Sequence, residues 1–362
     1  MDNKKYLTIL GIETSCDETA ASLLKVIPKN KGVRFEIISN VVSSQVSIHR
    51  QYGGIVPEMA ARAHIGKIIP VIESCLKKMP RAKKLPDLIA VTSGPGLITS
   101  LLVGVETAKT LSYVWQKPLL GINHLKGHVA VNFMSGNQQK IFPAVCLIVS
   151  GGHSELVLMK NYNQYQKIGQ TRDDAAGECF DKVAKLLNIG YPGGPVISQQ
   201  AEQFGLKIKT IKFSLPRPMI NSDNFDFSFS GLKTAVLYLI KKQKHKLSDK
   251  KFVQAVCAET QQAIVDVLVS KTMRAAKKFK TKSVILCGGV AANKELRKQL
   301  KFQVESLNPE VNFLVPPQNL CTDNAVMIAA AAYFKFKNLT KTQQNRLKNN
   351  WQKIKTNPNL EI

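Results

Sequence analysis

The chain has 362 residues, of which 44% are hydrophobic and 21% are charged, and this composition excludes a largely disordered protein. It provides enough apolar residues for one large core or for two domains of about 150 residues each. The formal net charge of +26 favours a polyanionic partner such as nucleic acid, although a general surface bias toward lysine explains the same charge.

The first third of the chain predicts three antiparallel strands, which fall in "YLTILGI", "CDETAASLLKVI" and "RFEIISNVVSSQ". A helix from Pro57 to Met79 follows, with a kink expected at Pro70. The segment "LPDLIAVTSGPG" predicts a strand that ends in a glycine-rich turn. An amphipathic helix is expected from Thr99 to Trp115, then a short strand in "KPLLGIN" and a helix from His124 to Phe133.

The opening pattern starts again at Phe142. The segment "FPAVCLIVSGGHSELVLMK" can be laid over "LTILGIETSCDETAASLLKV", and each predicts a hairpin with serine and a carboxylate near its turn. Two such starts, each followed by helices and a further strand, predict a duplicated α/β unit. We therefore expect a first lobe at residues 1–141 together with a helix at 323–335, a second lobe at 142–322, and a basic peripheral tail at 336–362.

The second half continues with a predicted helix in "DDAAGECFDKVAKLLNIG", the loop "YPGGP" and a polar segment at residues 220–229. A long helix is expected from Ser248 to Lys278. The segment "KSVILCGGVAANKELRKQL" predicts a strand, a Gly-Gly turn and a helix. A last strand in "NFLVPP" precedes an alanine-rich helix from Asp323 to Phe334.

The seven cysteines are scattered and form no C-x-x-C pair, which argues against a zinc ribbon or a disulfide framework and is typical of reduced thiols. The N-terminal residues enter a strand at once, so no signal peptide is expected. No run of about 18 apolar residues predicts a transmembrane helix. We therefore expect a cytoplasmic protein with no membrane partner.

Two histidines, His124 and His128, lie four residues apart on one predicted helix face, so both imidazoles can reach one metal ion. The alternative is a pair of partly buried histidines without a metal. Leu125 stands where the zincin motif needs glutamate as a general base, which argues against a metallopeptidase. Asp323 is the best candidate for a third ligand, although helix N-capping explains that residue equally well. Two histidines and one carboxylate suit Fe(II) or Zn.

Glycine-rich turns recur in "SGPG", "VSGGHS", "YPGGP" and "CGGVAAN", and such turns leave backbone N–H groups free to meet phosphate oxygens. None matches the Walker or Rossmann fingerprint, and each alone is also an ordinary tight turn. Asp174, Glu178 and Asp181 share a helical face that suits ribose hydroxyls or, alternatively, solvent. Together these segments favour a nucleotide-shaped site.

Taken together and in their order along the chain, the motifs are specific for one protein family. In this order, "GIETSCDETAAS", "TSGPGLITSLLVG", "NHLKGH", "IVSGGHSEL", "DDAAGECFDKVAKLLN", "YPGGP", "FSFSGLKTA", "CGGVAANKELR" and "CTDNA" closely resemble the tRNA N6-adenosine threonylcarbamoyltransferase family, most of all its bacterial-type branch. The resemblance covers roughly residues 7–332 and leaves out only the basic tail.

The resemblance implies an α/β fold of the actin/Hsp70/sugar-kinase type, with two duplicated lobes around a central cleft. It implies transfer of a threonylcarbamoyl group from threonylcarbamoyl-AMP to N6 of the adenosine 3′ of the anticodon, in tRNAs that read codons beginning with A. A divalent metal, usually iron with zinc as the alternative, would be held by His124, His128 and Asp323. The partners implied are tRNA, an inactive paralogue and a small ATPase; mitochondrial relatives can act alone.

The resemblance also implies a set of substrate-binding residues: Ile148, Val149, Ser150, Gly151, Gly152, Asp181, Gly194 and Asn293. Ser198 stands where many relatives carry a carboxylate, which puts one ribose contact in doubt. Asp17, Glu18 and His153 are the candidates for the general base that takes the N6 proton, and the sequence does not choose among them. Lysine-rich segments at 77–84, 241–251 and 271–282 are candidates for binding the tRNA backbone.

Three rival functions fit parts of the same pattern. A metallopeptidase fits the histidine pair, a small-molecule kinase or ATPase fits the glycine-rich turns, and a non-catalytic paralogue fits the fold. The absence of glutamate at Leu125 argues against the first. The histidine pair has no role in the second, and retention of His124, His128 and Asp323 argues against the third.

Overall fold

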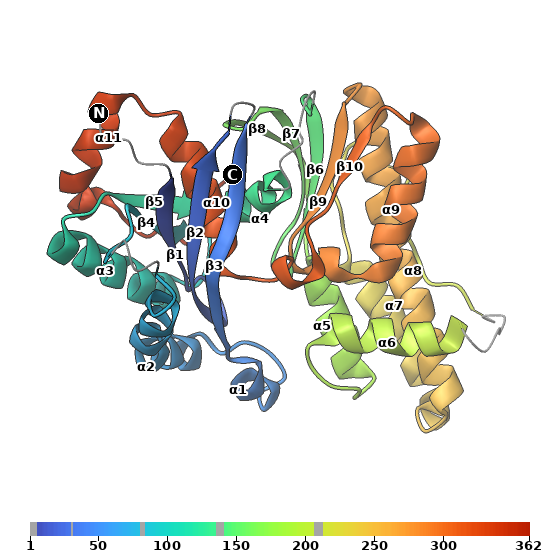
Figure 1. Ribbon diagram of the computed structural model, residues 1–362. Helices are drawn as coiled ribbons and strands as arrows, with labels where there is room; N and C mark the ends of the chain where they lie inside the picture. Colours follow the sequence, from blue (N-terminus) through green and yellow to red (C-terminus); the bar gives the residue numbers. More distant parts are fainter. Residues whose placement is uncertain (1–5, 30–31, 80–83, 135–140, 206–212) are drawn as a thin grey trace. The chain divides into compact units, whose positions relative to one another are not determined.

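The computed structural model describes residues 6–29, 32–79, 84–134, 141–205 and 213–362. The chain divides into two compact units (Figure 1). Unit 1 comprises Met1–Gln139 and Asp323–Ile362, and unit 2 comprises Lys140–Thr322. The return of the chain end to unit 1 brings the helix after Asp323 back to the first sheet.

Unit 1 contains a five-stranded sheet in the order β3-β2-β1-β4-β5. Its elements are β1 (Leu7–Glu13), β2 (Glu18–Pro28), β3 (Val33–Ser44), α1 (Val46–Arg50), α2 (Pro57–Leu76), β4 (Leu88–Gly94), α3 (Ile98–Trp115), β5 (Leu119–Asn123), α4 (His124–Ala130), η1 (Val131–Phe133), α10 (Ala325–Lys337), α11 (Lys341–Arg346), η5 (Leu347–Asn349) and η6 (Trp351–Lys353). β1 pairs antiparallel with β2 and parallel with β4, and β4 pairs parallel with β5.

The two faces of this sheet bury different helices because successive side chains of a strand point in opposite directions. Leu10 and Ile12 of β1 enter a core formed with residues of α2 and α3. The residue between them, Gly11, faces α10, where an added Cβ would lie 2.2 Å from the Ala325 carbonyl oxygen. Glycine at this position therefore allows α10 to pack directly on the strand.

Unit 2 contains a second five-stranded sheet in the order β10-β9-β6-β7-β8. Its elements are β6 (Ala144–Val149), β7 (Ser154–Asn161), β8 (Gln164–Gln170), α5 (Ala176–Leu186), α6 (Gly193–Gly205), α7 (Ser230–Lys242), η2 (Lys244–Lys246), α8 (Lys250–Lys278), β9 (Ser283–Cys287), η3 (Gly289–Ala292), α9 (Lys294–Leu307), β10 (Asn312–Leu314) and η4 (Gln318–Leu320). Its core joins residues of this sheet to residues of all five α-helices of the unit among those described.

The two sheets have the same topology. In each, the first strand is central, the second and third follow antiparallel on one side, and the fourth and fifth follow parallel on the other. The predicted duplication is therefore confirmed, and the repeated α/β unit is that of the actin/Hsp70/sugar-kinase class. The prediction omitted α1, β8, α6, α7 and α11.

One helix in the described part of the chain, α8, is long and apolar enough to cross a membrane, but 83% of its most apolar window is buried inside the protein. Such burial is what the central helix of a packed core requires. All seven cysteines lie within the described ranges, and none of them forms a disulfide.

The last residues of the segment predicted as a basic peripheral tail make defined contacts within unit 1. The Asn357 backbone N–H donates to the Ser93 carbonyl at 2.8 Å, and the Asn123 side chain donates to the carbonyls of Leu360 and Glu361 at 3.2 and 3.0 Å. Trp351 packs against the core beneath α3. The chain end is thus part of unit 1, because backbone hydrogen bonds and one aromatic anchor compensate for its low apolar content.

Candidate active site

Two histidines and one aspartate meet in unit 1. α4 begins at His124 and is capped by Asn123, whose side chain accepts from the Lys126 backbone N–H at 3.1 Å. His124 and His128 share one face of this helix. Their Nε2 atoms lie 3.5 and 3.1 Å from Oδ1 of Asp323, the residue two before α10. One ligand atom from each of the three lies within 4.8 Å of the others, so the cluster can hold a metal ion.

A buried carboxylate orients the first of these histidines. Glu13, at the end of β1, is fully buried, and its Oε2 lies 3.1 Å from His124 Nδ1. Thr92 and the Ser15 backbone donate to the same carboxylate at 2.6 and 2.5 Å. A hydrogen bond between Nδ1 and this carboxylate leaves Nε2 directed at the cluster. Histidine ligands of metal sites are commonly oriented in this way, with the second ring nitrogen bonded to a carboxylate. The sequence alone does not identify Glu13 as part of the site, because only the fold brings β1 to α4.

Charges at the cluster shift the pKa values of His124 and of the neighbouring Glu13. Burial lowers the pKa of His124, but Asp323 and Glu13 outweigh it and raise the value to about 9. Burial raises the pKa of Glu13, and the charge and hydrogen bond of His124 outweigh this, so its net pKa falls. The donor set, two imidazole nitrogens and a carboxylate oxygen, is one that suits Fe(II) or Zn with positions left open.

Two of the three candidate bases also lie in unit 1, at the turn between β1 and β2. Burial, Asp17 and Asp323 raise the pKa of Glu18 to about 7, while a hydrogen bond from Ser44 at 2.8 Å opposes the shift. Within the described part of the chain, Glu18 Oε2 is buried and has no hydrogen-bond partner. Burial and the charge of Asp323 likewise raise the pKa of Asp17.

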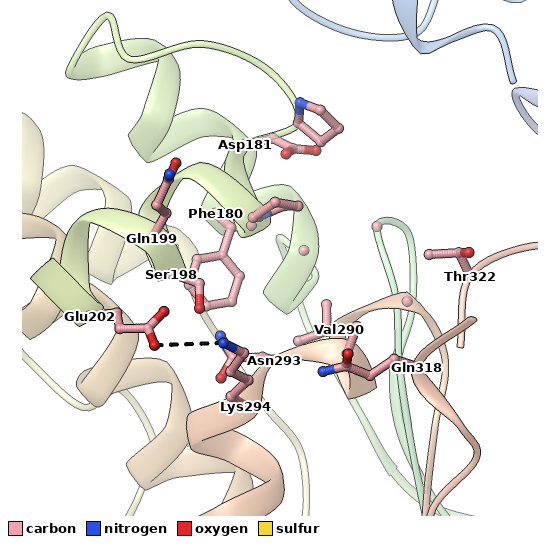
Figure 2. A pocket seen from close by; sticks show the side chains of 17 residues that line it. Phe180, Asp181, Ser198, Gln199, Glu202, Val290, Asn293, Lys294, Gln318 and Thr322 are labelled. Carbon is pink, nitrogen blue, oxygen red and sulfur yellow. Dashed lines mark ion pairs between the residues drawn. The ribbon is translucent and has the colours of Figure 1, made fainter. Parts of the chain in front are cut away.

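Unit 2 contains a cavity of about 550 Å³, which is within the usual range for small-molecule sites (Figure 2). Its walls come from α5 and α6, from the turn η3 with the start of α9, and from the segment after β10. Four predicted substrate-binding residues line it: Gly151, Asp181, Gly194 and Asn293. Ser198, at the position where relatives often carry a carboxylate, lines it as well.

Three glycines expose backbone to the cavity. Added Cβ atoms on Gly151, Gly194 and Gly289 would meet no atom within 4 Å among the described residues. Packing of the protein therefore does not require glycine at these positions. Their missing side chains leave room for a ligand to approach the backbone closely, which is how glycine-rich turns bind phosphates.

Asp181 and Asn293 have partners within the protein. Asp181 Oδ1 accepts from the Gly193 backbone N–H at 2.6 Å, which ties α5 to the "PGG" loop beside the cavity. Asn293 caps α9 through the Leu296 N–H at 3.0 Å and donates to Gln261 at 2.8 Å. The Asn293 side chain therefore lines the cavity and also holds the surrounding wall in place through these hydrogen bonds.

The other predicted substrate residues lie outside the lining that the described residues form. Ile148 and Val149 are fully buried in β6. Ser150 closes the turn that follows: its backbone N–H donates to the His153 carbonyl at 2.8 Å, and its hydroxyl accepts from the His153 N–H at 3.1 Å. Gly152 and His153 belong to this turn. These residues therefore place Gly151 at the cavity rather than lining it.

The carboxylate face predicted on α5 is only partly a binding face. Lys182 pairs with Asp174 at 2.7 Å and with Glu178 at 2.9 Å, so the two carboxylates share one positive charge within the protein. Asp181 alone of the three carboxylates lines the cavity. Glu178 lies on α5 with its side chain 44% exposed, whereas Asp174 precedes the helix and its side chain is only 14% exposed.

Most of the residues that line the cavity were not among the predicted substrate-binding residues. These further lining residues include Phe180, Gln199, Glu202, Lys294, Gln318 and Thr322. Figure 2 shows Glu202 and Lys294 facing one another at one edge of the cavity, where they form an ion pair of 3.6 Å. These residues come from segments that are distant in the sequence, so no local pattern could group them.

Comparisons with known proteins agree with this architecture. A family model described as "TsaD: tRNA N6-adenosine threonylcarbamoyltransferase" matches residues 36–330. Curated proteins of that name from Thermomicrobium roseum and Syntrophomonas wolfei are each 46% identical to the chain, over 91% of it and over 92% and 93% of their own lengths.

A solved structure of full-length HypF in a phosphate- and nucleotide-bound form superposes with a TM-score of 0.54 at 14% identity, over 92% of this chain and 47% of that one. A likeness at this identity concerns the fold alone.

The fold and the comparisons first define a class, a duplicated α/β protein of the actin/sugar-kinase type that acts as an acyltransferase on tRNA. Within that class, the chain belongs to the tRNA N6-adenosine threonylcarbamoyltransferase family. Its activity is the threonylcarbamoylation of adenosine in tRNA.

Proposed function

We propose that the chain uses threonylcarbamoyl-AMP as donor and releases AMP, and that its acceptor is N6 of the adenosine 3′ of the anticodon in tRNAs that read codons beginning with A. The observation that carries this proposal is the glycine-walled cavity of unit 2, whose size and exposed backbone suit an adenylate. Backbone N–H groups at Gly151 and Gly194 would bind its polar groups, and Asp181 would bind its ribose hydroxyls.

The cluster of His124, His128 and Asp323 would hold one divalent metal, with iron as the expected ion. Bound there, the metal would supply Lewis-acid polarisation of the carbamoyl carbonyl. Glu13 would keep His124 in the tautomer that presents Nε2 to the ion.

Glu18 is the residue that we propose as the general base. The N6 amine attacks the carbamoyl carbon, the bond from that carbon to the phosphate oxygen breaks, and the amine proton passes to Glu18. A pKa of about 7 and a buried carboxylate oxygen without a partner in the described structure support this role. Asp17 would raise the pKa of Glu18, and His153 would support the turn that carries Gly151.

A valine at Gly194 should test the cavity. Because an added Cβ there meets no protein atom, Gly194→Val should leave the melting temperature near that of the native chain, place its side chain in the cavity and weaken AMP binding at least tenfold. The measurements are AMP titration and transfer of labelled threonylcarbamoyl from its AMP ester to unmodified tRNA. Gly205→Val, at the other end of α6 with equal space, is the matched control. Native AMP affinity in Gly194→Val would exclude this cavity as the donor site.

We propose that residues 241–251 bind the tRNA backbone. This segment, which joins α7 to α8, holds six lysines, all exposed, and a single carboxylate, Asp249. Of the other two predicted segments, 77–84 extends into residues outside the described ranges. The segment 271–282 begins with the buried Lys271, which binds Ser222 and Asn224.

Neutralising this segment should reduce the salt dependence of tRNA binding. Each lysine–phosphate contact contributes about 0.7 to 0.9 to the slope of log K against log salt, so glutamine at Lys241, Lys242, Lys244 and Lys246 should lower that slope by up to about 3. The matched control places glutamine at four exposed cations of the chain end. These are Lys341, Arg346, Lys348 and Lys353. An unchanged slope in the first variant, or an equal loss in the second, would contradict the assignment.

The remaining proposals concern the setting in which the enzyme acts. We place it in the cytoplasm, which is consistent with the absence of a disulfide among its seven cysteines. We also propose that it works with an inactive paralogue and a small ATPase, as the resemblance to the bacterial-type branch implies.

A further inference from the structure

Arg297 joins two separate walls of the cavity. On one side its Nε donates to the Ala291 carbonyl of η3 at 2.5 Å, between the lining residues Val290 and Ala292. On the other side its Nη2 donates to the Pro316 carbonyl at 2.7 Å and to the Cys321 sulfur at 2.8 Å. Arg297 therefore links η3 to the segment that contains Pro316 and Cys321, and both segments contribute residues to the cavity lining.

The second of these segments continues directly into the cation cluster along the chain. The Cys321 thiol closes the segment by donating to the Pro317 carbonyl at 3.4 Å. The next residue, Thr322, lines the cavity, and the one after it is Asp323 of the cluster. Consecutive Cα atoms are about 3.8 Å apart, so a shift of the backbone at Cys321 reaches both residues.

We propose that Arg297 is a positioning residue that sets nucleotide affinity and metal affinity together, through its hold on Cys321 and the two residues that follow. The inference rests on the proposed function, because it takes the cavity as the nucleotide site and the cluster as the metal site. Arg297 touches neither site in this role. It acts through the backbone that carries Thr322 and Asp323.

The geometry requires arginine. A guanidinium has donors in a fixed planar fork, and here Nε and Nη2 donate to acceptors in two different segments of the chain. A lysine ammonium at the same position cannot reach both, although it keeps the charge. Arg297→Lys therefore removes the bridge while changing the electrostatics little.

The test measures two affinities in the full chain. AMP binding is followed by calorimetry, and Zn²⁺ binding by competition with a chromophoric chelator. We expect Arg297→Lys to weaken each about tenfold, which corresponds to about 1.4 kcal/mol, since loss of partners that orient a metal ligand costs ten- to a hundredfold. Arg217→Lys is the matched control, because Arg217 makes a comparable fork to Glu259 and Asp266 in the same unit but has no partner at the cavity or the cluster among those described.

The outcomes separate the inference from the proposed function. If the native chain binds neither AMP nor Zn²⁺, the proposed function fails. If the native chain binds both and Arg297→Lys binds both equally well, with only its melting temperature lowered as in the control, the residue is merely structural and the inference is overturned. Loss of AMP affinity with native Zn²⁺ affinity also overturns it. Should Arg297→Lys not fold, Cys321→Ala, which keeps Arg297 and removes one acceptor, should weaken both affinities in the same ratio, and native values there would overturn the inference.

Discussion

Replacing His128 with alanine is expected to abolish metal binding at the cluster and, with it, threonylcarbamoyl transfer to tRNA. His128 supplies one of three ligand atoms, and its Nε2 lies 3.1 Å from Asp323. Loss of residues that only orient a ligand already costs ten- to a hundredfold in metal affinity, so loss of a ligand should exceed about a hundredfold. The measurements are metal content after reconstitution, Zn²⁺ affinity, and single-turnover transfer from threonylcarbamoyl-AMP.

The control must distinguish the effect of losing a metal ligand from the effect of removing a buried imidazole ring. His49 is also fully buried, and its Nε2 lies 3.2 Å from Gln45 Oε1 rather than at the cluster. His49→Gln should keep metal affinity and transfer while lowering stability somewhat. A His128→Ala protein that lacks metal but transfers at the native rate would show that the cation is not used in the reaction. A protein that retains full metal affinity would show that the cluster is not the binding site.

The duplicated fold could be predicted because each half opens on a hairpin, and a hairpin is encoded locally. Apolar strand residues on both sides of a short polar or glycine-rich turn occur at β1–β2 and again at β6–β7, and the registers pair across each turn as the sequence indicates. The spacing of His124 and His128 on α4 is equally local. Such features survive in any tertiary context that allows the strand or helix to form.

The omitted helix α7 shows the opposite case. Its N-terminus has no cap of its own. Instead, Asp173, 57 residues earlier, accepts hydrogen bonds from the Phe229 and Ser230 backbone N–H groups at 2.8 and 3.1 Å and from the hydroxyls of Ser228 and Ser230 at 2.6 Å. A distant carboxylate thus performs the capping that sequence reasoning seeks next to the helix. The serines and backbone N–H groups of the "FSFSG" motif have their role only in combination with Asp173, which accepts their hydrogen bonds.

The residues of the candidate site also fall into two groups, those with a local sequence signal and those that only the fold brings to the site. The metal ligands and the glycines of the cavity carry local signals, whereas Glu13, Glu202 and Thr322 join their sites only through the fold. The turn "VSGG" illustrates a further limit: the sequence indicates that it matters but not which of its residues faces the ligand. Hydrogen bonds between Ser150 and His153 close the turn and leave Gly151 at the cavity.

The pH dependence of transfer is expected to follow the ionisation of Glu18. Its pKa is raised from 4.5 to about 7, and a general base acts in its ionised form, so the single-turnover rate should be lost as the pH falls below about 7. Asp323 contributes to that raised pKa. A cation bound at the cluster would oppose this contribution, and the inflection should therefore move to lower pH when metal is bound.

Glu18→Gln should lower the transfer rate by about 10²- to 10⁴-fold and remove this inflection, because the amide cannot accept the N6 proton. Asp17→Asn provides the comparison: it keeps Glu18 ionisable but removes a charge that raises its pKa, so the inflection should remain and shift to lower pH. Rates measured from pH 5.5 to 9 at saturating donor and tRNA distinguish the two. If Glu18→Gln keeps the native profile while Asp17→Asn loses it, the proton passes to Asp17 rather than to Glu18.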